Sequence, residues 1–315
     1  MICKVLFVGV GSIAKRHIRN LHAIENDSLH FEIDAVRRTA VPTDGVEHIY
    51  QSASEAPDNY DIVFITNPTE YHLSALRQYH EKGKNFFIEK PVVSIGQIKE
   101  AQKMELKEDS TYYVACPLRY NAVIQYIKTN IAPSDVISVR SISSSYLPDW
   151  RPGQDYRETY SAHKALGGGV SIDLIHEWDY LTYLFGWPSR VFSLIGKKSD
   201  LEIDSDDYAV YIAEFKDKIA ELHLDYFGRK TIREIQLFTK DDTIIGDIAN
   251  NQITFMKSGK TIRFEEERDD CQKRELLHFF GMVSNEQKDA DDFLHAVKVL
   301  GLTQGNVNEN NRLPE

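Results

Sequence analysis

Cysteine is scarce in this chain of 315 residues, which has only Cys3, Cys116 and Cys271. The three lie far apart, so they form neither a CxxC pair nor an even-numbered disulfide framework. The pattern therefore predicts no metal site and no disulfide scaffold. Isolated cysteines of this kind are typical of proteins of the reducing cytoplasm, and we expect that location.

Long apolar runs and an excess of positive charge are also lacking. No stretch approaches the length that crosses a membrane, and the first residues do not have the basic and apolar regions of a signal peptide. The formal net charge is −11, whereas a general nucleic-acid binder needs a basic surface. We therefore expect a soluble protein whose partner is a small molecule, with neither nucleic acid nor membrane.

The sequence opens with a predicted strand, a glycine-rich turn and a helix. Apolar residues 5–8 precede "GVGSIA" at 9–14, the GxGxxA form of the dinucleotide-binding fingerprint. Such a turn lets the backbone approach a pyrophosphate, to which the next helix offers its free N–H groups. The alternative is a tight strand-to-helix turn without a ligand. The predicted cofactor-binding residues here are Gly9, Gly11, Ser12, Ile13 and Ala14.

An acidic residue is missing where the second predicted strand, residues 31–36, ends. NAD-binding domains usually place an acid there to bind the ribose 2′-hydroxyl, but this strand is followed by Arg37 and Arg38. Guanidinium groups pair with phosphate in bidentate geometry, so the pattern favours NADP, with NAD as the second choice. The alternative is that both arginines are solvated on a loop.

Polar motifs follow two further predicted strands, residues 62–65 and 86–88. Strands and helices alternate with short connections, which predicts a parallel sheet whose carboxyl edge binds ligands. Pro91 holds Lys90 extended at that edge. His72 is either a further cofactor contact or a helix residue that faces a neighbour. The predicted residues at the strand ends are Thr66, Asn67, Pro68, Glu89, Lys90 and Pro91.

The pattern changes near residue 120, which divides the chain into a predicted Rossmann domain, 1–119, and a second domain, 120–315. Several segments between 135 and 257 alternate in hydrophobicity with short turns, which is typical of an antiparallel sheet. A helix is expected after the glycines at 167–169. On it, Asp173, His176 and Glu177 fall mainly on the side opposite the apolar stripe.

The loop at residues 146–169 is too long for a plain connection, and it is cationic and aromatic within an acidic protein. Aromatic faces stack on sugars or bases, and arginines bind carboxylate or phosphate. We expect an anionic sugar substrate, either a sugar acid or a nucleotide-linked sugar. The alternative is an arm that packs on a partner subunit. The predicted substrate residues are Arg119, Trp150, Arg151, Tyr156, Arg157, Tyr160 and Glu177.

Four motifs together resemble the Gfo/Idh/MocA oxidoreductases: "GVGSIA" at 9–14, "TNP" at 66–68, "EKP" at 89–91 and "GGGVSIDLIHEWD" at 167–179. The resemblance implies an α/β chain, with a Rossmann parallel sheet followed by an α+β domain with a large, mostly antiparallel sheet. It also implies NAD(P)-dependent hydride transfer at a hydroxyl-bearing carbon of a sugar or polyol. Assembly into a homodimer or homotetramer through the second domain is implied as well.

The resemblance assigns the chemistry to Lys90, Asp173 and His176. The family separates its Asp and His by three residues, whereas two separate them here, so a regular helix brings Glu177 to the histidine position. We prefer His176, because imidazole exchanges a proton near neutral pH. Two other functions stay open: a sensor that binds NADP without turnover, and a redox-assisted glycosidase.

Overall fold

The computed structural model describes residues 2–284 and 291–305. These residues group into two compact units, the first within Met1–Pro117 and Gln272–Val297, the second within Leu118–Cys271 and Lys298–Glu315. The change of unit after Pro117 lies close to the predicted division after residue 119. The sequence did not indicate that the chain returns to the first unit at Gln272. Among the described helices, none combines the length and the apolar character needed to cross a membrane.

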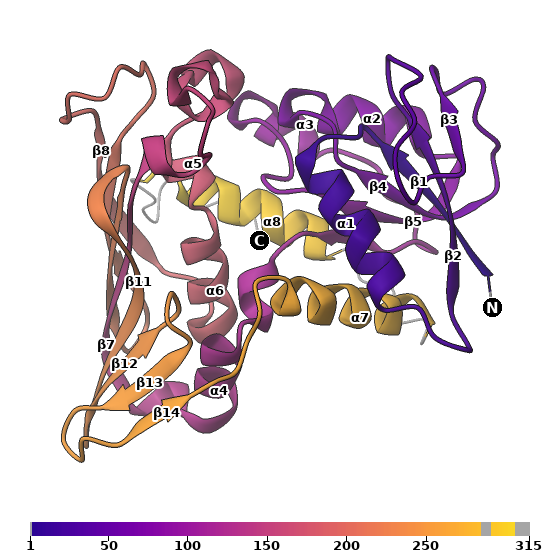
Figure 1. Ribbon diagram of the computed structural model, residues 1–315. Coiled ribbons are helices and arrows are strands. Elements are labelled where there is room, and N and C mark those ends of the chain that lie inside the picture. The colour runs from indigo at the N-terminus through magenta and orange to yellow at the C-terminus, as the bar shows by residue number, and fades with distance from the viewer. Residues whose placement is uncertain (1, 285–290, 306–315) are drawn as a thin grey trace. The chain divides into compact units, whose positions relative to one another are not determined.

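The first unit contains a six-stranded parallel sheet with the strand order β3-β2-β1-β4-β5-β6 (Figure 1). This order reverses direction between β1 and β4, which is the switch point where Rossmann sheets bind dinucleotides. The predicted Rossmann sheet is therefore confirmed. Its strands are β1 Ile2–Val8, β2 His30–Val36, β3 His48–Tyr50, β4 Tyr60–Ile65, β5 Gly83–Ile88 and β6 Tyr112–Val114.

Aromatic side chains form the centre of this sheet's core. Phe7, Phe64 and Phe87 stand on neighbouring strands with ring centroids 4.6 and 4.7 Å apart, and all three are fully buried. Phe279, on a helix late in the chain, meets the rings of Phe64 and Phe87 edge-on. This stacking fixes the register of the strands that carry the site. The helices around the sheet are α1 Ser12–Ala23, α2 His72–Tyr79, α3 Ile98–Ala101 and α7 Asp270–Ser284.

The second unit is built on an eight-stranded sheet with the order β14-β13-β12-β11-β7-β10-β9-β8. Only β7 and β10 pair in parallel, so the predicted large, mostly antiparallel sheet is confirmed. Its strands are β7 Val136–Tyr146, β8 Arg190–Gly196, β9 Tyr208–Glu214, β10 Ile219–Asp225, β11 Phe227–Thr239, β12 Thr243–Asp247, β13 Gln252–Phe255 and β14 Thr261–Arg263.

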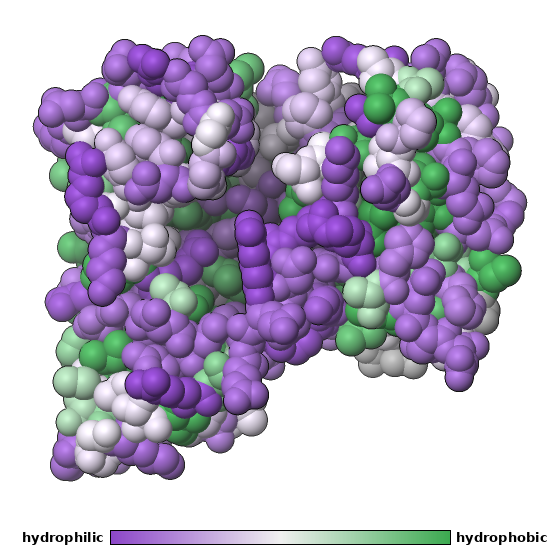
Figure 2. All heavy atoms as spheres, in the orientation of Figure 1, coloured by the Kyte–Doolittle hydropathy of each residue, from purple (hydrophilic) through white to green (hydrophobic). Residues whose placement is uncertain are grey.

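Helices cover one face of this sheet and leave the other to solvent (Figure 1). They are α4 Ala122–Asn130, α5 Val170–Asp173 and α6 His176–Phe185, while α8 Asp291–Leu302 closes the described chain. On the outer face, Phe192, Leu194 and Ile212 are each more than half exposed. Figure 2 shows apolar side chains in green along this outer side of the second unit, among hydrophilic ones. An antiparallel sheet covered on one side has this alternation.

The helix predicted after the three glycines is in fact two helices. α5 ends at Asp173, Leu174 leaves the helical conformation with φ −97° and ψ 34°, and α6 begins at His176. The break turns the second helix relative to the first, so the faces expected from one regular helix do not hold. Glu177, expected on the polar side, is fully buried.

Candidate functional site

The glycine turn of the first unit lies against the end of β4. Gly9 has φ +89°, and a Cβ atom there would stand 2.7 Å from the Cα of Asn67. The hydroxyl of Thr66 donates a hydrogen bond of 2.7 Å to the carbonyl oxygen of Gly9. The two predicted motifs are therefore in direct contact, and glycine at position 9 is required both by the backbone angle and by the close approach.

The contact with Asn67 gives Gly9 a role in the fold, whereas we expect Gly11 to act in cofactor binding. We expect Gly9→Ala to cost about 2–4 kcal/mol of stability, because it adds left-handed strain to a steric clash. Gly11 has φ −90° and open space where a Cβ atom would stand, so Gly11→Ala should change stability by less than ~1 kcal/mol. It should instead weaken NAD binding about tenfold, because the methyl group stands where a pyrophosphate approaches. Urea unfolding and cofactor titration of both variants measure this; equal stability losses would contradict it.

The amino terminus of α1 has the features of an anion site. Gly11 is its N-cap, no side chain caps the helix, and the first helical bond runs from the Lys15 N–H to the Gly11 carbonyl. The N–H groups of Ser12, Ile13 and Ala14 precede that bond, so they have no partner within the helix. Ala14 is fully buried, which lets the helix approach the sheet. These residues fit a dinucleotide cofactor bound by its pyrophosphate.

The two arginines after β2 differ in their surroundings. Arg37 is half-buried and makes long contacts of 3.5 and 3.4 Å with the Val41 carbonyl and the Thr43 hydroxyl, whereas Arg38 is exposed. Among the described residues, neither pairs with a carboxylate within ion-pair distance. Both guanidinium groups are therefore available to an anion at the carboxyl edge of the sheet.

The end of β5 is organised by a buried acid–histidine pair. The Oε1 atom of Glu89 lies 2.6 Å from Nε2 of His17, and its Oε2 atom accepts a hydrogen bond of 3.1 Å from the backbone N–H of Lys90. His17 and Glu89 are 2% and 8% exposed, so water does not compete for these bonds. The Lys90–Pro91 peptide is cis. The carboxylate thus fixes the backbone that carries Lys90, whose side chain is half-exposed.

Burial by itself would raise the pKa of Glu89, but the hydrogen bond and charge of His17 outweigh it, with Lys90 and His72 adding to the effect. The pKa of Glu89 is therefore lowered in the folded protein. Its contribution to stability is present above the ordinary value of 4.5 and is lost as pH falls through the lower folded value. We expect wild type to exceed Glu89→Gln in urea midpoint by a constant margin near neutral pH, and the margin to shrink below pH 4.5. A margin that is independent of pH would contradict this.

His72 connects the two strand ends. Its Nε2 atom lies 2.8 Å from the Asn67 carbonyl oxygen, and its Nδ1 atom lies 3.1 Å from that of Pro91. Burial lowers the pKa of His72, so the ring is neutral near pH 7 and donates through one nitrogen at a time. Both ring nitrogens of His72 thus face backbone carbonyls of the two strand ends.

In the second unit, a cluster of aromatic residues surrounds Asp173, which is 5% exposed. Tyr226 donates a hydrogen bond of 2.6 Å to Oδ2 of Asp173, and Trp150 meets the Tyr226 ring edge-on at 5.2 Å. Desolvation of its hydroxyl and the Asp173 carboxylate raise the pKa of Tyr160, although the residue as a whole is exposed. The guanidinium of Arg151 lies 5.3 Å from the Tyr160 ring centre. Four predicted residues, Trp150, Arg151, Tyr160 and Asp173, are thus brought together.

A second carboxyl group stands at the amino terminus of α5. Asp206 accepts a hydrogen bond of 2.9 Å from the Ser171 N–H. Gly169, with φ +134°, leaves room for it, because a Cβ there would lie 2.2 Å from its Oδ1 atom. Burial and the nearby charge of Asp173 raise the pKa of Asp206. Gly169 therefore allows Asp206 to approach the amino terminus of this short helix.

Two predicted substrate residues have internal partners instead. The Glu177 carboxylate is fully buried and receives two hydrogen bonds from Arg233 of β11, at 2.6 and 3.2 Å. Arg119 donates two hydrogen bonds to Asp179, at 2.9 and 2.6 Å, and its side chain is only 14% exposed. The charges of both groups are therefore compensated within the protein. Of the two residues left open at the start of α6, only His176, which is partly exposed, is accessible.

The remaining loop residues lie beside the cluster around Asp173. Arg157 is exposed and paired with Asp155 and Glu202, so its charge is already compensated. The Tyr156 hydroxyl accepts a hydrogen bond of 3.1 Å from the Glu202 N–H. Its ring borders a small cavity that Trp150 and Arg151 also line.

Sequence reasoning missed three residues that organise these groups: His17, Tyr226 and Arg233. Each of them bonds to a residue far away in the sequence. The separation is 72 residues for His17, 53 for Tyr226 and 56 for Arg233. His17 carried a weak signal, because a histidine on the buried side of α1 requires a polar partner. Tyr226 and Arg233 carried none, since a strand pattern shows which face a residue occupies but not what it meets.

The fold and the glycine turn define a NAD-binding Rossmann protein with a second, sheet-based domain. Residues 3–116 match the oxidoreductase family with the Gfo/Idh/MocA NAD-binding Rossmann fold, and residues 124–244 match the Gfo/Idh/MocA C-terminal domain. The chain therefore belongs to the Gfo/Idh/MocA oxidoreductases, as its motifs predicted.

Individual relatives are distant. The uncharacterised oxidoreductase YrbE of Bacillus subtilis (strain 168) is 26% identical over 223 residues, which are 66% of this chain and 62% of that protein. Levoglucosan dehydrogenase in complex with NADH matches with TM-score 0.82 and 16% identity, over 98% of this chain and 96% of that one. Myo-inositol 2-dehydrogenase from Lactobacillus plantarum has TM-score 0.75 and 19% identity, over 96% of each chain. UDP-N-acetylglucosamine 3-dehydrogenase from Acidithiobacillus ferrooxidans matches with TM-score 0.76 and 17% identity, over 99% of each chain. At these identities the structural likeness establishes the fold.

Proposed function

We propose that the protein is an NAD(P)-dependent dehydrogenase that transfers a hydride between the nicotinamide and a hydroxyl-bearing carbon of a sugar. The observation that carries the proposal is the position of Lys90. It stands at the carboxyl end of a Rossmann strand, and the buried pair His17–Glu89 fixes its backbone. A lysine of no function would not require two buried polar groups behind it, each of which costs desolvation.

In the oxidation, the substrate carbon loses a hydride, its hydroxyl loses a proton, and a carbonyl forms. The nicotinamide, when bound, accepts the hydride. Lys90 donates a hydrogen bond to the reacting oxygen and stabilises its negative charge as the proton leaves. His176 accepts that proton and returns it in the reverse direction. Asp173, held by Tyr226, orients a substrate hydroxyl.

The cofactor proposed is NADP, with NAD as the alternative, because the guanidinium groups of Arg37 and Arg38 after β2 have no carboxylate partner among the described residues. We expect Arg37→Ala to weaken NADP binding roughly ten- to a hundredfold, the usual value of a charge-assisted contact to phosphate, and to leave NAD binding within about threefold. Titration of both cofactors into wild type and variant measures the ratio. Tighter binding of NAD than of NADP by the wild type would overturn this preference.

The substrate proposed is anionic, because Arg151 stands in the cluster around Asp173, and no ion pair of its guanidinium is found among the described residues. Neutral, acidic and nucleotide-linked sugars are screened with NADP and NAD by nicotinamide absorbance. Arg151→Ala should impair turnover of anionic sugars only, and the compensated Arg157 supplies the matched control, Arg157→Ala. Equal losses for neutral and anionic sugars would overturn the anionic assignment.

The same screen separates the two other functions. A sensor would bind NADP without turnover of any sugar. A redox-assisted glycosidase would cleave a glycoside without net absorbance change, because it reduces again what it has oxidised. The presence of Lys90, Asp173 and His176 together favours the dehydrogenase over the sensor.

The assembly proposed is a homodimer or homotetramer through the outer face of the second sheet. That face exposes Phe192, Leu194 and Ile212 by 53–64%, which is unfavourable in water unless it is covered. Light scattering of wild type and Leu194→Glu gives the molar masses. A monomeric wild type would overturn the proposal.

A further inference from the structure

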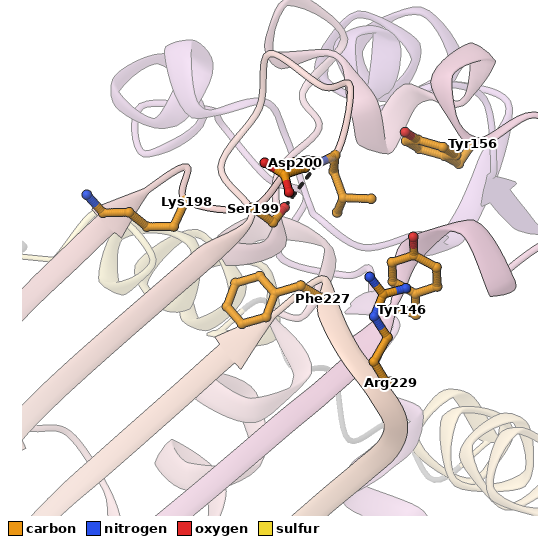
Figure 3. A pocket seen from close by; sticks show the side chains of 8 residues that line it. Tyr146, Tyr156, Lys198, Ser199, Asp200, Phe227 and Arg229 are labelled. Atoms are coloured by element: carbon orange, nitrogen blue, oxygen red, sulfur yellow. Dashed lines mark hydrogen bonds between the residues drawn. The ribbon is translucent and has the colours of Figure 1, made fainter.

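A cavity of about 380 Å³ opens in the second unit beside the candidate substrate residues, of which Tyr156 lines it (Figure 3). It lies where β7 ends, β11 begins and the chain turns after β8. This is the size range of pockets for small organic ligands. The side chains on which the argument rests are Tyr146, Tyr156, Lys198, Asp200, Phe227 and Arg229.

One wall of the cavity is held rigid by a buried carboxylate. Asp207 is fully buried and accepts hydrogen bonds of 2.8 Å from the N–H groups of Lys198 and Ser199. It also accepts a bond of 2.6 Å from the Ser199 hydroxyl. The turn that carries Lys198 and Asp200 is therefore fixed by the protein itself, so a ligand would meet a preformed surface.

The opposite wall presents a stacked cation. The guanidinium of Arg229 lies 3.9 Å from the centre of the Tyr146 ring, and Figure 3 shows the two side chains together with the Phe227 ring beside them. Within the described part of the chain, neither Arg229 nor Lys198 has a carboxylate within ion-pair distance. An arginine stacked on a tyrosine keeps its N–H groups directed outward and is suited to phosphate.

The cavity adjoins the candidate substrate residues of the same unit. Phe227 directly follows Tyr226, whose hydroxyl bonds to Asp173. Tyr156 lines this cavity and also the small one bordered by Trp150 and Arg151. A ligand that extends from the Asp173 cluster along these tyrosines would therefore enter the cavity.

From this arrangement we propose that the cavity binds the nucleoside diphosphate part of a nucleotide-linked sugar. Three aromatic rings offer flat surfaces for a base, Arg229 and Lys198 bind the phosphates, and Asp200 accepts from a ribose hydroxyl or a base N–H. A lone carboxylate, as in a sugar acid, would use the cations but leave the rings without a partner. The inference rests on the proposed function, whose substrate class it narrows.

Calorimetric titration with uridine, guanosine, cytidine and thymidine 5′-diphosphates tests the inference. Saturating NADPH is present throughout, so that the probes cannot bind at the cofactor residues. We expect at least one nucleotide to bind, and Arg229→Gln to weaken it roughly ten- to a hundredfold. Lys230→Gln is the matched control, because Lys230 is the next residue, is exposed and does not line the cavity. This variant should bind the nucleotide with the affinity of wild type.

The result that overturns the inference is that no nucleotide binds, or that Arg229→Gln and Lys230→Gln weaken binding equally. Inorganic pyrophosphate is titrated in parallel, and if it binds as tightly as the nucleotides, the cavity is an anion site without a base and the inference is wrong. These outcomes leave the proposed function standing, because turnover of a simple sugar with NADP is measured separately.

Discussion

Replacing Lys90 by alanine is expected to lower kcat for sugar oxidation by about 10²–10³-fold, the usual effect of removing a donor that stabilises the charge developing on the reacting oxygen. The substitution leaves Glu89 and its bond to the backbone N–H of residue 90 in place. Folding and cofactor affinity should therefore change little. Steady-state kinetics on the substrate found by screening, together with a cofactor titration, separate the two effects.

The control for this prediction is Lys99→Ala, because Lys99 is exposed and lies on the short helix α3 away from the strand ends. It should retain wild-type kcat. Undiminished turnover by Lys90→Ala would contradict the mechanism. A parallel loss of cofactor binding would show instead that Lys90 acts in binding.

The sequence predicted those parts of the structure that depend on local chemistry. The turn at Gly9 and the strand end at Lys90 each follow from a few adjacent residues, and both lie where the sequence predicted them. Alternating hydrophobicity likewise predicted β9 and β10, because one face of each strand is buried and the other is not. The strands β3 and β6 have three residues each, too few to show any period, and were not predicted.

What the sequence could not predict depends on contacts between distant residues. The break at Leu174 directly follows the buried Asp173, and no glycine or proline marks it. A helical projection across that break therefore assigned Glu177 to the accessible side, whereas the structure buries it against Arg233. Likewise, nothing in the sequence indicated that Arg119 is paired, because its partner Asp179 is 60 residues away.

The buried pair Glu177–Arg233 supplies the second large effect. We expect Glu177→Gln to lower the free energy of unfolding of the second unit by about 3 kcal/mol, because it leaves the guanidinium of Arg233, whose side chain is only 24% exposed, without a countercharge. Burial alone would lower the pKa of Arg233, but Glu177 outweighs it and raises that pKa, so Arg233 is charged in the folded protein. The three tryptophans, Trp150, Trp178 and Trp187, all lie in this unit, so fluorescence in a urea titration reports its unfolding.

An exposed pair on the same sheet provides the comparison. Arg140 and Glu221 are 45% and 46% exposed with their atoms 2.9 Å apart, and Glu221→Gln should change stability by less than ~1 kcal/mol. The double variant Glu177→Leu, Arg233→Met removes both buried charges and should recover much of the loss, since neither partner is then left alone. If Glu177→Gln costs no more than Glu221→Gln, the pair does not fix α6 to the sheet. His176, the first residue of α6, would then owe its position to the apolar packing of Trp178 and Leu181 instead.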